Sequence, residues 1–304
     1  MFVSESTSLD PVGTDPAAGE PAYVFDLAGG VMLRLSAYSV LLCFLAAGVF
    51  SVLTKSEGSS LQPTDWVRPV LYVLVYFGTV VAHELVHGVF FRIFGGRPQY
   101  GAGVKYFLPY FYATSPGDAF SVRQMIIIGL APLLTLSTLS LLGALVAPAL
   151  VGYFAVVFIG NTAGAVGDLW MTSRLIAFAQ VKDATVVDLV DGMAVHSQEA
   201  EAGAIAERLS ARDGRPAGFA VHWLGATLVV LAAEAVAMPI VLFFTDSLLI
   251  GPAQLPLMAF EESSERMAWT LNLTSPLVAG FIFAFVARLF ARGTSSGAEP
   301  RTVE

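Results

Sequence analysis

The sequence predicts an all-α integral membrane protein of about six transmembrane helices, with a short β-hairpin or re-entrant segment after the second helix. Of the 304 residues, 56% are hydrophobic and only 13% are charged, whereas soluble domains carry roughly twice that charged fraction. Six apolar runs reach the roughly 20 residues that a helix needs to cross a bilayer. They are Val31–Leu53, Val67–Phe94, Gln124–Pro148, Val151–Ala179, Phe219–Phe244 and Ala268–Phe290.

The lysines and arginines, 16 in all, predict the orientation of these spans. With six spans and a cytoplasmic N-terminus, all of them except Lys55, Arg68 and Arg266 fall on the cytoplasmic side. Basic residues are enriched in cytoplasmic loops, so we expect a multi-pass protein of the cell membrane with both termini in the cytoplasm. One span more or fewer would scatter the basic residues over both sides.

The polar segments predict how the rest of the chain is organised. Residues 1–30 are rich in Ser, Asp, Gly and Pro, and we expect them to form a disordered lead, with 293–304 as a disordered tail. The membrane domain would occupy 31–292. Within it, residues 181–218 are polar and include a predicted surface helix, Ser197–Arg212. Because an independent domain needs roughly 50 residues, we expect this segment to be a cytoplasmic appendage.

Charge and cysteine content exclude some kinds of partner and site. The net charge of −8 argues against nucleic acid as a partner, whereas the apolar runs require the lipid bilayer. The single cysteine, Cys43, lies inside the first run. It permits neither an intramolecular disulfide nor a cysteine cluster for a metal ion.

Three ionisable residues lie within five positions of the second apolar run, in His83-Glu84-Leu85-Val86-His87. In a lipid-spanning helix each costs at least about 2.5 kcal/mol unless it is paired, neutralised or facing a wet cavity. A helix places residues i and i+4 on one face, so His83 and His87 can bind one metal ion. Glu84 lies beside them and can accept a proton from water. This is the zincin arrangement, and it predicts one zinc ion per chain.

A catalytic zinc usually has three protein ligands, and Asp168 is the candidate for the third. It follows a stretch of small residues, and Asn161 lies seven residues earlier, so both side chains fall on nearly the same helix face. Depth supports the assignment. His87 precedes Arg92 by five residues and Asp168 precedes Arg174 by six, which places both roughly 8–9 Å from a cytoplasmic basic residue.

The segment that follows the second apolar run differs in character from the spans. Gly95-Gly96-Arg97-Pro98 predicts the end of the helix, and Gln99–Phe120 then mixes Gly and Pro with many aromatic residues. The segment is too short to cross the bilayer as a helix. It is compatible with a β-hairpin, a re-entrant loop or an aromatic belt at the membrane interface.

These motifs resemble the site-2 protease class of intramembrane zinc metalloproteases, and within it a family of zincin peptidases labelled as a domain of unknown function. The resemblance rests on residues 83–88, the Tyr- and Pro-rich segment after them, Ala131-Pro132, and Asn161 through Asp168. It covers the chain from Val67 to Arg174, about a third of its length.

The resemblance implies a role for each candidate residue. Glu84 would be the general base and acid, and His83, His87 and Asp168 would be the zinc ligands. Asn161 would help to hold the substrate carbonyl or oxyanion.

The predicted function is hydrolysis of peptide bonds in membrane-embedded or membrane-adjacent protein substrates by a zinc metalloendopeptidase. One alternative is a non-hydrolytic zinc-binding scaffold or chaperone of membrane segments. Such a scaffold would use the histidines but not the carboxylate of Glu84. A transporter is a third alternative, but it needs a polar pathway through the outer half of the spans, where this sequence has almost no charge. The sequence predicts no oligomeric state.

Overall fold

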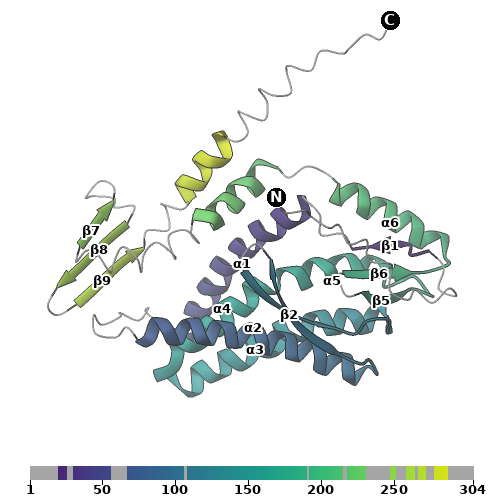
Figure 1. Cartoon of the computed structure of the whole chain (residues 1–304), viewed down its shortest axis with the longest axis horizontal. Coiled ribbons are helices and arrows are strands. Elements are labelled where there is room, and N and C mark those ends of the chain that lie inside the picture. The colour runs from purple at the N-terminus through teal and green to yellow at the C-terminus, as the bar shows by residue number, and fades with distance from the viewer. Residues whose placement is uncertain are drawn as a thin grey trace, which may run out of the picture. The chain divides into compact units, whose positions relative to one another are not determined.

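The structure is a computed structural model that is mostly helical (Figure 1). It describes residues 20–25, 30–55, 67–105, 108–189, 192–214, 218–230, 247–250, 258–263, 266–271 and 277–286. The chain divides into two compact units. The first comprises Met1–Asp26, Glu84–Ala131 and Met171–Arg212, and the second comprises Leu27–His83, Pro132–Trp170 and Asp213–Glu304.

In the second unit, helix α1 (Gly30–Thr54) packs along α4 (Val151–Gly164), as Figure 1 shows. The hydroxyl of Ser39 on α1 donates to the carbonyl of Ala163 on α4 at 2.9 Å. The glycine and alanine positions of α4 allow such close approach.

The second unit contains two further elements. A short 3₁₀ helix, η1 (Pro148–Leu150), precedes α4. The strands β7 (Ser247–Ile250), β8 (Met258–Ser263) and β9 (Arg266–Leu271) form an antiparallel sheet.

Among the described residues, three helical segments are long and apolar enough to cross a membrane: Val31–Thr54, Val70–Ile93 and Val122–Val146. They lie in α1, α2 (Val67–Ile93) and α3 (Val122–Val146), and they match the first three predicted spans. The fourth predicted span is broken. Pro148–Gly164 and α5 (Val166–Phe178) meet at an angle of 43°, because the chain leaves helical geometry at Ala165, where ψ is 8°.

The prediction of six spans is not supported by the described residues, which contain three candidate spans, or four if the bent pair is one span. Only Phe219–Val230 of the fifth predicted span is described as a helix, and the rest of that span lies outside the described residues. The sixth prediction is wrong at its start. Ala268 lies in β9, which pairs with β8, and the apolar helix Leu277–Val286 follows later.

The first unit contains a four-stranded sheet of order β1-β6-β5-β4, whose strands β5 and β6 are neighbours in Figure 1. The strands are β1 (Tyr23–Val24), β4 (Ala119–Ser121), β5 (Thr185–Leu189) and β6 (Gly192–His196), and helix α6 (Ala200–Asp213) follows β6.

This sheet corrects two sequence-based expectations. Tyr23 and Val24 pair with β6 and therefore do not belong to a disordered lead. Residues 181–218 are not an appendage, because β5 pairs with β4, and Val186 and Val195 lie opposite each other, fully buried. The predicted surface helix is α6. The predicted tail, 293–304, lies outside the described residues.

The end of α2 leads directly into the predicted hairpin. Gly95 has φ +88°, and the N–H groups of Gly95 and Gly96 donate to the carbonyls of Arg92 and Phe91 at 3.1 and 2.9 Å. This pattern is a Schellman cap, which needs a residue that tolerates positive φ. Strands β2 (Gln99–Lys105) and β3 (Leu108–Thr114) then pair antiparallel, so the segment forms the predicted β-hairpin.

Hydrogen bonds to Asp188 of β5 fix the base of this hairpin. The buried carboxylate accepts from the hydroxyl of Thr114 at 2.8 Å and from the N–H of Ser115. Burial raises the pKa of Asp188, and these two hydrogen bonds oppose the rise. The hydroxyl of Ser115 in turn donates to Asp118 at 2.7 Å, and this bond is the main cause of a lowered pKa of Asp118. The last residues of β3 are thereby held against β5.

Candidate metal centre

Helix α2 has a polar stripe that faces the interior and an apolar surface that faces outward. Thr79, His83 and His87, spaced four residues apart, are 5%, 9% and 9% exposed. Leu85 and Val89, on the other side, are 49% and 53% exposed. A helix in a soluble protein shows the opposite pattern, so the exposed face of α2 suits lipid and the buried stripe suits a site.

His83, His87 and Asp168 form a group whose ligand atoms all lie within 4.8 Å of one another. The imidazole Nε2 of His83 and the carboxylate Oδ2 of Asp168 are 3.0 Å apart. Two histidines come from consecutive turns of α2, and Asp168 comes from the first turn of α5, directly after the bend at Ala165. Two imidazoles and one carboxylate are the ligands of many catalytic zinc sites, so this donor set fits zinc.

His87 is oriented by the backbone carbonyl of Ile128 in α3, which has no hydrogen-bond donor within its own helix because Pro132 follows four residues later. Pro132 lies inside that helix and has no N–H to donate to the carbonyl of Ile128, four residues earlier. The Nδ1 of His87 lies 2.9 Å from this same Ile128 oxygen. Because a carbonyl can only accept, Nδ1 carries the proton, and Nε2 keeps the lone pair that a metal ion needs.

His83 is oriented by Asn161 of α4. The Oδ1 of this asparagine, which is 2% exposed, lies 2.8 Å from Nδ1 of His83. Its Nδ2 donates to the hydroxyl of Ser137 at 3.0 Å and to the carbonyl of Pro132 at 3.2 Å. These acceptors fix the amide so that Oδ1 accepts from the Nδ1–H of His83, and Nε2 of His83 is turned toward Asp168.

The structure thus brings the predicted residues together through partners that the sequence analysis did not identify. The seven-residue interval between Asn161 and Asp168 was a usable signal, and both residues contact His83. Ile128 and Ser137 carry no signal, because a backbone carbonyl oxygen, or one of several serines and threonines in an apolar helix, has no distinctive pattern. Pro132 belongs to the motifs of the resemblance, but the sequence does not show that its missing N–H leaves the Ile128 carbonyl to His87.

We expect Pro132→Ala to weaken zinc binding by about 10-fold or more, the lower end of the cost of losing a hydrogen-bond partner of a metal ligand. The new N–H at position 132 would compete with His87 for the Ile128 carbonyl. Chelator competition in detergent-purified protein measures the affinity, with Leu134→Ala, at an exposed position of the same helix, as the matched control. Equal affinities for the Pro132→Ala variant and the wild type would show that the Ile128 carbonyl does not hold His87.

Glu84 follows His83 in α2, but its carboxylate is not part of the ligand group. Its Oε2 accepts from the backbone N–H of Ala113 in β3 at 2.9 Å. A carboxylate beside the ligands and outside the ligand group is suited to proton transfer.

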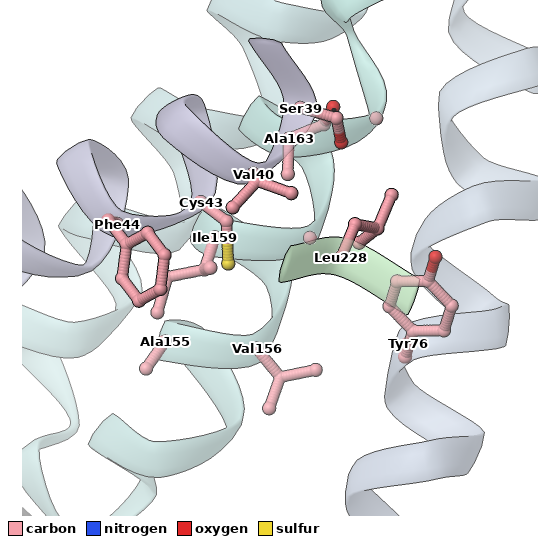
Figure 2. A pocket seen from close by; sticks show the side chains of 12 residues that line it. Ser39, Val40, Cys43, Phe44, Tyr76, Ala155, Val156, Ile159, Ala163 and Leu228 are labelled. Carbon is pink, nitrogen blue, oxygen red and sulfur yellow. Dashed lines mark hydrogen bonds between the residues drawn. The ribbon is translucent and has the colours of Figure 1, made fainter. Parts of the chain in front are cut away.

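A separate cavity of about 580 Å³ lies in the second unit. Figure 2 shows its lining of small and apolar side chains from α1 and α4, with Tyr76 of α2 and Leu228 beside them. Its one hydroxyl from α1, on Ser39, already donates to Ala163. None of the five predicted site residues is among its lining residues, so within the described part of the chain it is distinct from the metal centre.

Comparison with known families agrees with this chemistry. Residues 76–181 match a family described as "Putative zincin peptidase". The matched range contains His83, Glu84, His87, Asn161 and Asp168. Searches of curated proteins and of solved structures gave no match. The family match supports a zincin-like peptidase that uses zinc, and the long apolar helices are consistent with a location in the membrane.

Proposed function

We propose that this zincin-like protein is an intramembrane zinc metalloendopeptidase of the site-2 protease type, which cleaves membrane-embedded or membrane-adjacent proteins. One observation carries the proposal. Two of the three candidate ligands lie in the buried stripe of α2, an apolar helix of membrane-spanning length, and the third lies in α5, which forms a bent apolar pair with the preceding helix. A metal centre at that position is reached by peptide bonds that lie in or near the bilayer.

The residues of this chain divide the chemistry between them. His83 and His87 would hold zinc through Nε2 and Asp168 through its carboxylate, and the bound metal supplies Lewis-acid polarisation. Glu84 accepts a proton from the attacking water at its carboxylate and returns it to the leaving amine. Asn161 keeps His83 in its orientation, since both ends of its amide already have partners. This positioning role has more support than the predicted contact with the oxyanion.

The substrate is a peptide segment in extended conformation. A helical transmembrane segment hides its carbonyls in intrahelical hydrogen bonds, so it must unwind locally before a carbonyl can react. The β2–β3 hairpin follows α2 directly and offers backbone groups for an added strand. Strand addition would keep the unwound segment hydrogen-bonded next to the metal centre.

Comparison of membrane proteomes tests the proposal. Cells that produce the wild type and cells that produce Glu84→Gln should differ in proteins that become shorter only when Glu84 is intact. Identical proteomes, together with normal zinc content in both proteins, would favour the non-hydrolytic scaffold.

We also propose that both termini and residues 181–218 face the cytoplasm, as the basic residues predict. Reporter fusions at Glu304 and near Ser197 should report a cytoplasmic location, and a fusion near Lys55, in a predicted outer loop, is the matched control. An external reporter at Ser197 would place the cut near the outer surface of the membrane.

A further inference from the structure

The outer edge of β3 faces the carboxylate of Glu84. The N–H of Ala113 donates to Glu84 and is therefore not used in the ladder with Tyr100, its partner in the register. In an antiparallel pair, alternate residues direct their N–H and C=O groups away from the neighbouring strand. Phe111 and Pro109 therefore share this outer edge with Ala113.

Only part of this edge can accept an added strand. Pro109 has no N–H, and proline occurs in strands at positions whose N–H is not needed by the ladder. Pro109 and Ala113 are four residues apart and face the same side of β3, so a proline at position 109 agrees with the assignment of Ala113 to the outer edge. Within β3, the remaining outward donors are those of Phe111 and Ala113. An incoming strand must therefore pair at the end of β3 that lies against Glu84.

The edge itself is held in place. Thr114 and Ser115, which follow Ala113, donate to the buried carboxylate of Asp188. Tyr100, opposite Ala113, packs on Gly88 of α2 so closely that a Cβ at Gly88 would overlap its ring. The side chain of Glu84 has rotatable bonds, whereas the backbone of Ala113 is fixed on both sides. Glu84 is therefore the more adjustable partner of this contact.

We propose that the Ala113 N–H is a positioning group that holds Glu84 while no substrate is bound. An extended substrate segment that pairs with the outer edge of β3 supplies a backbone carbonyl to this N–H and releases the Glu84 carboxylate to act as the base. Strand pairing thereby prepares the base for the reaction. The inference rests on the proposed function and adds a requirement to it: the substrate must present an extended backbone at Phe111 and Ala113.

The Ala113 amide can be observed by itself, because Tyr112-Ala113 is the only Tyr-Ala pair in the sequence. Labelling with carbonyl-¹³C tyrosine and ¹⁵N alanine gives one selected amide signal, whose exchange with solvent is measured in full-length, detergent-purified protein. We expect Glu84→Ala to accelerate this exchange by about 10-fold or more, as loss of a hydrogen bond on an exposed edge allows. Glu84→Gln should retain the protection, because its amide oxygen can accept, and Leu85→Ala is the control on the same helix. Equal exchange in Glu84→Ala and the wild type would overturn the proposal.

Unfolded β-casein serves as the extended peptide, and fluorescence anisotropy confirms that it is bound. Bound casein should restore slow exchange of the Ala113 amide in Glu84→Ala, because its carbonyl replaces the missing carboxylate. Fast exchange with casein bound would exclude pairing at this edge. Hydrolysis of casein by the wild type reports separately on the proposed function, so a failure of either idea can be recognised.

A pair of proline variants tests the same donor by kinetics. Ala113→Pro removes the N–H that faces Glu84, whereas Ala102→Pro removes an N–H from the opposite edge of the same hairpin, because Ala102 pairs with Phe111. We expect Ala113→Pro to raise KM for casein by about 2- to 10-fold, the effect of one hydrogen bond, with kcat within about 2-fold. Ala102→Pro should change neither. Equal losses in both variants would assign the effect to the hairpin fold and overturn the proposal.

Discussion

Glu84→Gln should abolish hydrolysis of β-casein by the detergent-purified protein while the zinc content stays at the wild-type level. The amide has nearly the same shape as the carboxylate and can still accept from Ala113, but it cannot take up a proton at neutral pH. Loss of a general base costs about 10²- to 10⁴-fold in rate, so we expect a decrease of at least about 10²-fold. A fluorescent casein assay measures the rate, and elemental analysis measures the zinc.

The matched control is Glu207→Gln, the same change at an exposed position of α6, which should leave both measurements unchanged. Wild-type cleavage by Glu84→Gln would rule out Glu84 as the base.

His83→Ala and Asp168→Ala should each remove most of the zinc from a protein that otherwise binds one ion per chain. Each variant deletes one of three ligands, so we expect an affinity loss larger than the roughly 10- to 100-fold that follows loss of a ligand's hydrogen-bond partner. Elemental analysis after purification in detergent gives the stoichiometry, and circular dichroism confirms that the helices remain.

His222→Ala replaces an exposed histidine outside the ligand group and should keep its zinc. Full zinc occupancy in Asp168→Ala would remove Asp168 from the ligand set and leave the pair on α2 as the only protein ligands among those proposed.

The candidate site could be predicted where its pattern is local. His83 and His87 are related by one turn of one helix, so their spacing alone placed them together. Asp168 could be predicted because its separation in sequence from Arg174 is close to that of His87 from Arg92. Two spans that run in the same direction place residues at equal separations from such basic residues at similar depths. The partners of the histidines depend on how α2, α3 and α4 meet, and no local pattern contains that information.

The fold was predicted least well where segments distant in the sequence pair with each other. β1 and β6 are separated by most of the chain, and strands as short as Tyr23–Val24 carry no periodic signal. The strand at Ala268 was missed because its apolar residues continue into the next run, and hydrophobicity does not distinguish a strand from the start of a span. The bend at Ala165 was missed because no proline marks it.

The bend at Ala165 also changes the electrostatic environment of Asp168. In a straight span this carboxylate would lie in the middle of a helix, where the peptide dipoles before and after it largely cancel. Here it lies in the first turn of α5, a helix of 13 residues, next to the N–H groups at the positive end of that helix. An anion in that position is stabilised by about 0.3–1 kcal/mol or more when solvent is limited. By interrupting the helix, the fold supplies favourable charge to a candidate metal ligand within a largely apolar segment.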